Sequence, residues 1–372
     1  MIIGVPKEIK NNENRVAMVP DGVYEVVKMK HKVIVEAGAG IGSGISDDAY
    51  IKAGAVICTD KAKLFDDADI IVKVKEPIPI EYDFFKEGQM LYTYLHLAAD
   101  KQQAEFLTDK KITAIAYETI QKDDGSLPLL APMSEVAGRM SVQIGAALLQ
   151  KNNGGKGMLL GGVPGVAPAE VVILGGGNVG LNAVKMASWM GSRVTVLDIS
   201  RQRLAYLDDI FSGQVTTLMS SVYNIAESVK KADLLIGAVL IPGAKAPQLV
   251  TEEMVKTMSP GSVIVDVAID QGGCVETIDR TTSHENPYYE EHGVIHYSVA
   301  NMPGAVPKTS TYALTGMTIQ YLKRIISSDI ERLLEDDNEI RLGLNTYKGH
   351  VTNKSVAEAL DMAYVDVMSL IG

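Results

Sequence analysis

The stretch AEVVILGGGNVGLNAVKMASWMGSRVTVLDIS at residues 169–200 decides the predicted fold of this chain. A β-branched apolar run predicts a buried strand over residues 171–174, and a glycine-rich turn at 175–180 follows it directly. Apolar residues at helical spacing come next, and a second strand over residues 193–197 ends at Asp198. Strand, glycine turn, helix, strand and terminal acid in this order predict part of a doubly wound α/β domain.

The turn GGGNVG has the spacing of a dinucleotide-binding loop. Gly175 permits the tight turn, Gly177 lets the backbone approach a pyrophosphate, and Gly180 lets the helix pack closely on the strand. The helix N-terminus offers unpaired N–H groups to the phosphates. Asp198 is placed to accept hydrogen bonds from the ribose hydroxyls and would repel a 2′-phosphate. A lone glycine pattern is often only a turn, but the whole sequence of elements predicts an NAD site rather than an NADP site.

The composition is that of a soluble globular protein of about two domains. The chain has 372 residues, of which 47% are apolar and 22% are charged. Its net charge of −11 argues against nucleic acid or an anionic membrane as the main partner. Cys58 and Cys274 are too few for a disulfide framework, and no apolar run approaches the ~20 residues of a membrane span. We therefore expect a cytoplasmic protein with no membrane partner.

The first third of the chain alternates strand and helix patterns, which predicts a parallel sheet. A polar loop, residues 6–20, follows the first strand. The glycine run AGAGIGSGI at 37–45 resembles a second nucleotide loop, but no periodic helix begins directly after it, so we interpret it as a flexible connection. The main predicted strands of this part are 2–5, 33–36, 70–74, 89–95 and 113–117.

The domain organisation is predicted to be discontinuous. A long helix over 134–151 precedes a second α/β unit, and from residue 307 apolar stripes predict a helical tail that packs back on the first unit. We expect an α/β fold with two doubly wound, Rossmann-like domains and a cleft between them. The substrate domain would comprise residues 1–129 and 307–372, and residues 130–306 would form the inserted NAD-binding domain.

Candidate catalytic residues follow the predicted strands, where ligands bind in open α/β sheets. Arg15, Lys75 and His96 follow three strands of the first unit, and Asp270 and Asn301 follow strands of the second. Taken singly, each has a plainer interpretation: a surface ion pair, a solvated loop lysine, a strand-end histidine or a turn aspartate. Their shared placement at strand ends favours one catalytic site.

Metal and thiol chemistry are not indicated. The other histidines, at 31, 284, 292, 296 and 350, show no metal-ligand spacing, so we expect no metal site. Neither cysteine adjoins a histidine motif, so we do not expect a catalytic thiol nucleophile.

The stretches MIIGVPKEIKNNENRVAMVP at 1–20, KVKEP at 73–77 and DVAIDQGG at 266–273, among others, resemble motifs of the NAD-dependent L-alanine dehydrogenase family. The NAD-binding subunit of proton-translocating transhydrogenase and saccharopine dehydrogenase share parts of the pattern, but YLHLA at 94–98 and IDQGG at 269–273 favour alanine dehydrogenase. The remaining matches are PMSEVAGRMSVQIGA (132–146), GGVPGVAPAEVVILGGGNVG (161–180) and VANMPGAVPKTSTYALT (299–315).

The resemblance implies reversible oxidative deamination of L-alanine to pyruvate and ammonium with NAD as cofactor. It implies that Arg15 binds the substrate carboxylate, that Lys75 binds the carboxylate or the carbonyl oxygen, and that His96 is the general acid/base. Asp270 would assist the carbinolamine steps or orient water and ribose, Met133 and Asn301 would lie at the substrate, and Arg280 has no assigned role. The family commonly forms homo-hexamers. Implied cofactor contacts are Ser134, Gly175, Gly177, Asn178, Val179, Gly180, Asp198, Arg203, Ser220, Val239, Leu240, Val267, Ala268, Ile269, Asp270, Val299, Asn301 and Met302.

Two other functions remain open from the sequence. A transhydrogenase NAD subunit would pass hydride to NADP on a partner, and a non-enzymatic NAD-binding regulator would keep the fold without the chemistry. The regulator needs only the glycine turn and Asp198, so Arg15, Lys75 and His96 together argue against it.

Overall fold

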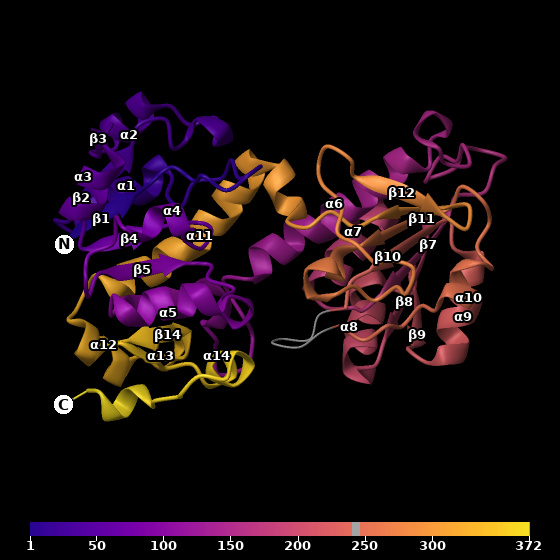
Figure 1. The fold of residues 1–372 in the computed structure, drawn as a ribbon. Coiled ribbons are helices and arrows are strands. Elements are labelled where there is room, and N and C mark those ends of the chain that lie inside the picture. Colours follow the sequence, from indigo (N-terminus) through magenta and orange to yellow (C-terminus); the bar gives the residue numbers. More distant parts are fainter. Residues whose placement is uncertain (240–245, 372) are drawn as a thin grey trace. The chain divides into compact units, whose positions relative to one another are not determined.

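The computed structural model describes residues 1–239 and 246–371, apart from the side chains of residues 270 and 271. The chain divides into two compact units (Figure 1). The first comprises Met1–Met133 with Val306–Gly372, and the second comprises Ser134–Ala305. Helix α6 (Ala131–Leu148) runs from one unit into the other.

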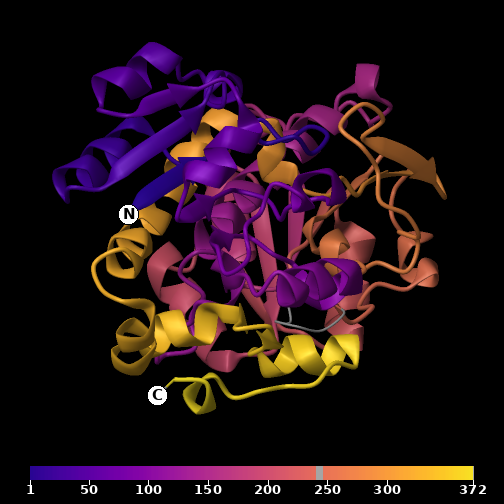
Figure 2. The ribbon, with the colours of Figure 1, turned by 60° about the vertical axis from the view of Figure 1, so that its left-hand side comes forward.

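The first unit is built on a mostly parallel sheet with the strand order β15-β14-β6-β5-β4-β1-β2-β3. Strands β1 to β6 are parallel to their neighbours, β14 is antiparallel to β6, and β15 is antiparallel to β14. Both ends of the chain belong to this unit (Figure 2). The strands are β1 (Ile2–Val5), β2 (Lys32–Glu36), β3 (Val56–Cys58), β4 (Ile70–Val72), β5 (Met90–Thr93), β6 (Thr113–Ala116), β14 (Leu344–Tyr347) and β15 (His350–Val351).

Helices cover both faces of this sheet because successive strand residues point to opposite sides. Ile71 and Leu91 belong to the apolar cluster under α3, α5 and α14, whereas the neighbouring Tyr92 donates its hydroxyl to the Thr318 carbonyl of α11 at 3.1 Å. The helices are α1 (Pro20–Lys28), α2 (Asp47–Lys52), α3 (Lys61–Asp67), α4 (Pro79–Tyr82), α5 (Lys101–Asp109), α11 (Pro307–Ile325), α12 (Ile330–Asp336), α13 (Asn338–Gly343) and α14 (Lys354–Leu360), with 3₁₀ turns η1 (Ile41–Ser43), η2 (Leu97–Ala99), η3 (Tyr117–Thr119) and η7 (Val367–Ser369).

The second unit repeats this plan with the strand order β12-β13-β11-β10-β7-β8-β9. Strand β12 is antiparallel to β13, and the pairs from β13 to β9 are parallel. The strands are β7 (Glu170–Leu174), β8 (Arg193–Asp198), β9 (Thr216–Met219), β10 (Leu234–Gly237), β11 (Val263–Asp266), β12 (Tyr288–Glu291) and β13 (Val294–Tyr297).

Helices α9 and α10 pack on one face of the second sheet through Ile225, Val229 and Val255, while α6 approaches Leu234. A Cβ on Gly138 of α6 would lie 2.2 Å from the Val179 carbonyl oxygen, so glycine allows α6 to lie against the start of α7. The helices are α7 (Asn178–Trp189), α8 (Arg201–Phe211), α9 (Val222–Lys231) and α10 (Glu252–Val255), with η4 (Lys151–Asn153), η5 (Val267–Gln271) and η6 (Met302–Ala305).

The predicted α/β class with parallel sheets is confirmed. The predicted strands lie where expected, although β4, β5 and β6 are shorter than predicted and β2, β7 and β8 are each one residue longer. The long helix begins at Ala131 instead of residue 134. The prediction of a purely helical tail was wrong, because β14 and β15 extend the first sheet and α14 ends at Asp361 in a left-handed conformation. The glycine run at 37–45 contains the turn η1, where the Ser43 hydroxyl donates to the Asn14 carbonyl at 2.9 Å. Within the described ranges, no helix is long and apolar enough to cross a membrane.

Candidate active site

The predicted residues of the first unit gather at one edge of its sheet. Strands β1, β4, β5 and β6 are parallel neighbours, so their carboxyl ends meet at the same edge. Arg15 lies in the loop after β1, Lys75 follows β4, and His96 follows β5. The structure therefore brings these three residues to one side of the unit.

Arg15 is held rigidly by a buried ion pair with Glu13. The guanidinium Nε donates to the Glu13 carboxylate at 2.7 Å, Nη2 pairs with its other oxygen, and Nη1 lies 3.2 Å from the sulfur of Met133. Arg15 is only 2% exposed. Burial alone would raise the pKa of Glu13, but its hydrogen bonds and ion pair with Arg15 lower it, so both groups stay charged. The pair fixes the plane of the guanidinium.

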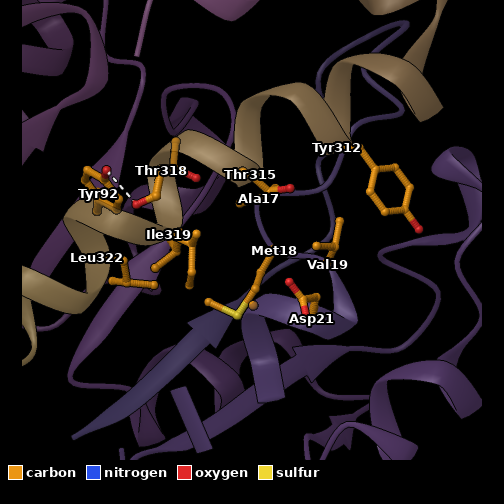
Figure 3. Close-up of a pocket in the computed structure, with 13 residues that line it drawn as sticks. Ala17, Met18, Val19, Asp21, Tyr92, Tyr312, Thr315, Thr318, Ile319 and Leu322 are labelled. Atoms are coloured by element: carbon orange, nitrogen blue, oxygen red, sulfur yellow. Dashed lines mark hydrogen bonds between the residues drawn. The ribbon is translucent and has the colours of Figure 1, made fainter. Parts of the chain in front are cut away.

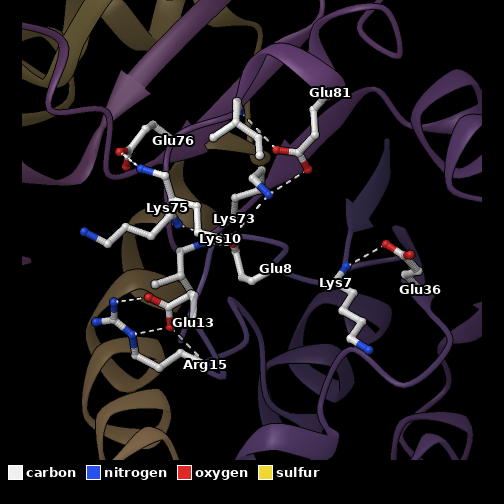
Figure 4. A network of polar contacts seen from close by, with 12 residues as sticks. Lys7, Glu8, Lys10, Glu13, Arg15, Glu36, Lys73, Lys75, Glu76 and Glu81 are labelled. Atoms are coloured by element: carbon white, nitrogen blue, oxygen red, sulfur yellow. Dashed lines mark hydrogen bonds and ion pairs between the residues drawn. The ribbon is translucent and has the colours of Figure 1, made fainter. Parts of the chain in front are cut away.

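Lys75 places a second cation near Arg15. In Figure 4 the end of its side chain points to the same side as the Arg15–Glu13 pair. Burial and the positive charge of Arg15 lower the pKa of Lys75. Among the described residues, none accepts a hydrogen bond from its Nζ or forms an ion pair with it. An amine and a guanidinium at one strand edge are suited to bind a small carboxylate.

A buried charge network lies behind Lys75 and supports the end of β4 (Figure 4). Lys73 is 1% exposed, and its Nζ lies 3.2 Å from a Glu8 oxygen and 3.1 Å from a Glu81 oxygen. Glu8 also accepts the N–H groups of Val74 at 2.6 Å and of Lys75 at 3.4 Å. Burial raises the pKa of Glu8, although Lys73 opposes that shift. The network anchors the backbone that carries Lys75.

His96 has an unusual backbone and two carboxylates beside it. Its φ is +48°, in the left-handed region, and its imidazole Nδ1 lies 3.3 Å from a Glu76 oxygen. The Glu118 carboxylate accepts the N–H of Leu95 at 3.0 Å and the N–H of His96 at 2.6 Å. The His96 side chain is 49% exposed, so solvent can reach the ring. Neither glutamate was predicted from the sequence, where each stands as an ordinary charged residue.

The glycine turn of the second unit has the predicted geometry. Gly175 has φ +95°, and a Cβ on Gly180 would lie 1.8 Å from the Gly175 carbonyl oxygen. A Cβ on Gly177 would meet nothing within 4 Å, so the backbone there is open to a close neighbour. The Asp198 carboxylate accepts the N–H groups of Gly176 and Ser200, each at 2.7 Å. These residues fit a dinucleotide: a tight turn, an open helix N-terminus and an acid after the next strand.

Arg203 was predicted as a cofactor contact, and the structure also gives it a local partner. Its guanidinium donates to the carbonyl oxygens of Gly176 and Gly177, the latter at 3.3 Å, and lies over the Tyr206 ring at 4.9 Å. Arg203 therefore braces the glycine turn. Ser134 lies one turn before Gly138 on α6, the residue that touches the start of α7.

The other predicted cofactor residues lie mostly at the carboxyl ends of the second sheet's strands. Leu240 lies outside the described residues, and Asp270 is described only as backbone within η5. Arg280 lies over the Tyr289 ring at 3.9 Å and pairs with Asp279 at 3.2 Å. The residues at these ends are Ser220 after β9, Val239 after β10, Val267, Ala268 and Ile269 after β11, and Val299, Asn301 and Met302 after β13.

The structure also has a cavity that is separate from the predicted site residues. A cavity of about 200 Å³ lies between α1 and α11, lined in part by Met18, Tyr92, Tyr312 and Ile319 (Figure 3). Its lining includes none of the predicted site residues. Over the part of the chain that the structure describes, no group of three or more His, Cys, Asp or Glu side chains could hold a metal ion.

Comparison with known proteins places the chain in a family. The family model "Alanine dehydrogenase/PNT, N-terminal domain" matches residues 4–137, and "Alanine dehydrogenase/PNT, C-terminal domain" matches residues 141–354. The alanine dehydrogenase of Methanococcus maripaludis is 62% identical over 364 residues, which cover 98% of this chain and 98% of that protein. The chain belongs to the alanine dehydrogenase/PNT family.

Solved structures agree with this placement. A structure of an L-alanine dehydrogenase has a TM-score of 0.94 and 49% identity, over 97% of this chain and 99% of that one. A transhydrogenase structure from Sinorhizobium meliloti has a TM-score of 0.80 and 26% identity, over 95% of this chain and all of that one (100%). The family resemblance predicted from the sequence motifs is confirmed. The L-alanine dehydrogenase structure is more similar to this chain than the transhydrogenase structure is.

Proposed function

We propose that this chain is an NAD-dependent L-alanine dehydrogenase. It converts L-alanine, NAD⁺ and water reversibly into pyruvate, ammonium, NADH and a proton. The observation that carries the proposal is the gathering of Arg15, Lys75 and His96 at one strand edge, in a chain 62% identical to an alanine dehydrogenase. A protein that only binds a dinucleotide needs none of these three side chains.

Arg15 and Lys75 bind and orient the substrate. A guanidinium held in one plane by Glu13 can meet a carboxylate through two parallel hydrogen bonds. Lys75 then holds the carboxylate or the carbonyl oxygen that pyruvate presents. Orienting a small acid in this way removes translational and rotational freedom before reaction, an effect that can reach ~7–11 kcal/mol. Met133, whose sulfur contacts the guanidinium, and Asn301 complete the substrate contacts.

His96 is the general acid/base of the reaction. When bound, NAD⁺ accepts the hydride that leaves Cα of alanine. This step requires that the substrate ammonium has first lost a proton, and it leaves an iminium. Water then adds to the iminium carbon, and His96 accepts one proton from that water and gives it to the amino nitrogen. The carbinolamine hydroxyl loses its remaining proton as ammonia leaves, so that pyruvate forms and the ammonia is protonated to ammonium. Its half-exposed ring allows proton exchange with solvent. Asp270 assists these steps or orients the water and the ribose.

The second unit holds the cofactor. The open backbone at Gly177 and the N-terminus of α7 receive the pyrophosphate, and the Asp198 carboxylate accepts the ribose hydroxyls. A 2′-phosphate would meet the negative charge of Asp198, which favours NAD over NADP. The other cofactor contacts are those at the strand ends of this unit, together with Ser134 and Arg203.

The proposal also covers the domain roles, the oligomeric state and the location of the protein in the cell. Residues 1–129 and 307–372 form the substrate domain, and residues 130–306 form the NAD-binding domain. The protein acts as a homo-hexamer in the cytoplasm.

A spectrophotometric assay tests the function. The purified chain alone is expected to oxidise NADH only when pyruvate and ammonium are both present, and to reduce NAD⁺ with L-alanine. Binding of NADH without this activity would contradict the proposal and would favour a transhydrogenase-type subunit or a regulator.

A further inference from the structure

His96 occupies a backbone conformation that its place in the fold does not explain. Its φ and ψ are +48° and +33°, a left-handed conformation that residues other than glycine seldom adopt. Ser212 and Asp361 share it at the ends of helices α8 and α14, where such a residue is common. His96 instead follows strand β5 and begins the turn η2. Some other interaction must hold it there.

Glu118 supplies that interaction from the neighbouring strand. It lies in η3, directly after β6, and β6 is the parallel neighbour of β5. One carboxylate oxygen accepts the N–H of Leu95 at 3.0 Å and the N–H of His96 at 2.6 Å, and the other lies 3.2 Å from the Leu95 nitrogen. Two consecutive N–H groups can converge on one carboxylate only when the chain turns between them. Glu118 therefore stabilises the turn that directs the imidazole.

Glu76 acts on the ring itself. Its Oε2 lies 3.3 Å from Nδ1 of His96, and its Oε1 pairs with Lys10. Burial alone raises the pKa of Glu76, but the hydrogen bond to His96 and the charges of His96, Lys10 and Lys75 lower it, so the carboxylate stays ionised. An ionised carboxylate beside Nδ1 requires a proton on that nitrogen. The other nitrogen, Nε2, is then the one available to substrate.

We propose that Glu118 and Glu76 are the positioning residues of His96. Glu118 fixes the backbone turn that aims the imidazole, and Glu76 keeps the proton on Nδ1, so that Nε2 exchanges the catalytic proton. This inference rests on the proposed function in which His96 is the general acid/base. The charged and titratable groups around the Glu76–His96 pair are Lys10, Lys75, Tyr82, Tyr94 and Glu118.

The test compares Glu118→Gln and Glu76→Gln with Glu87→Gln as a matched control. Glu87 makes a surface ion pair with Lys111 at 2.6 Å and is 67% exposed. We expect Glu118→Gln to lower kcat by about ten- to a hundredfold, because a displaced catalytic group costs about that much. The Kd for NADH should stay within about twofold and the KM for pyruvate should change little, because neither depends on the aim of the ring. Glu87→Gln should match the wild type throughout.

Glu76→Gln has a separate signature in the pH profile. This substitution removes the charge and the hydrogen-bond acceptor beside Nδ1, so the alkaline limb of kcat/KM for pyruvate amination should move to lower pH. Glu118→Gln should not move this limb comparably. If Glu118→Gln fails to fold, Glu118→Asp keeps the charge but is one methylene too short to reach both N–H groups.

A measurement without turnover separates this inference from the proposed function. In spectra of protein labelled with [¹⁵N]histidine, with the His96 signals identified through His96→Gln, the wild type should show a proton on Nδ1 at a pH where the ring is neutral. Glu76→Gln should lose that preference. Wild-type kcat in Glu118→Gln, an unmoved pH limb in Glu76→Gln, or a proton on Nε2 in the wild type would each overturn the assignment. An inactive wild type with the expected spectra would instead refute the proposed function.

Discussion

Alanine substitutions at two glycines of the 175–180 turn test two different roles of this loop. One role is the packing of the turn in the fold, and the other is its proposed contact with NAD. Gly180 lies where α7 meets the end of β7, and a Cβ there would sit 1.8 Å from the Gly175 carbonyl oxygen. Gly177 has space around it, since a Cβ would meet nothing within 4 Å, and its φ of −63° suits any residue. The two variants therefore differ in what they disturb.

The magnitudes follow from these distances. Real Cβ atoms essentially never come within 3.0 Å of another atom, so Gly180→Ala requires the start of α7 to move by roughly 1 Å from the strand. Overpacking of this kind costs about 1–3 kcal/mol of the free energy of unfolding. Gly177→Ala should change that free energy by less than about 0.5 kcal/mol. Both variants should bind NADH at least about tenfold more weakly, or ~1.4 kcal/mol, because the new methyl group occupies the pyrophosphate position or shifts it.

Urea denaturation followed by circular dichroism gives the free energy of unfolding, and NADH fluorescence titration gives the Kd. Gly316→Ala in α11 is the matched control, since a Cβ there also meets nothing within 4 Å, and it should leave the NADH Kd unchanged. Wild-type NADH affinity in Gly177→Ala would refute the assigned pyrophosphate contact. Unchanged stability in Gly180→Ala would refute the close packing of α7 on β7.

Three further predictions test the strand-end residues. Arg15→Lys keeps the positive charge but loses the planar pair of N–H donors, so the KM for pyruvate should rise by about tenfold or more while the Kd for NADH stays constant. An unchanged KM would exclude Arg15 as the carboxylate ligand. Asp198→Asn removes the charge that repels a 2′-phosphate, so the ratio of the NADPH and NADH dissociation constants should fall, and an unaltered ratio would contradict the assigned role. Burial alone raises the pKa of Glu13, but Arg15 lowers it below its ordinary value of 4.5. The stability that Glu13 contributes is therefore complete above about pH 4.5 and is lost as the pH falls through its folded-state pKa. The drop in Tm between about pH 5 and 3 should consequently be shallower in Glu13→Gln than in the wild type.

The glycine turn and the strand-end placement were predictable because they depend on local sequence. A β-branched run that breaks into Gly175–Gly180 allows few backbone solutions, and the order of parallel strands then determines which loops share an edge. Arg15, Lys75 and His96 could be grouped from sequence for this reason alone.

The short strands near the C-terminus could not be predicted in the same way. Strand β14 has four residues, Leu344–Tyr347, and pairs with β6, more than 200 residues earlier in the chain. So short a segment has no clear periodicity, and its pairing partner is not encoded nearby. Within the predicted helical tail, apolar residues at helical spacing (Val356, Leu360, Tyr364 and Val367) predicted a longer helix, but the chain leaves the helix at Asp361 with φ +52°. The helical spacing of the apolar residues after Asp361 is therefore a coincidence, because those residues are not in the helix.

Of the acids that support the site, Asp198 was predicted, and the others were missed for a further physical reason. At four strand ends a carboxylate accepts two backbone N–H groups from loops that follow its own or a neighbouring strand. Glu8 binds Val74 and Lys75, Glu118 binds Leu95 and His96, Asp198 binds Gly176 and Ser200, and Asp266 binds Ala268 and Cys274. In sequence Glu8, Glu118 and Asp266 are ordinary members of the chain's surplus of acidic residues. Their role depends on which strand lies next to which.

These four carboxylates share one physical task. A parallel strand that ends leaves N–H groups without ladder partners. Where such a group is buried, as at Val74, Ala268 and Cys274, leaving it unpaired would cost about 1–3 kcal/mol. A carboxylate has two oxygens and can satisfy two such groups at once, which holds the following loop in one conformation. The segments held in this way carry Lys75, His96, the glycine turn and the 267–270 loop. The same interactions that satisfy the strand ends therefore also give the proposed catalytic and cofactor-binding residues fixed positions before any ligand arrives, and that fixed placement is what orientation-based catalysis requires.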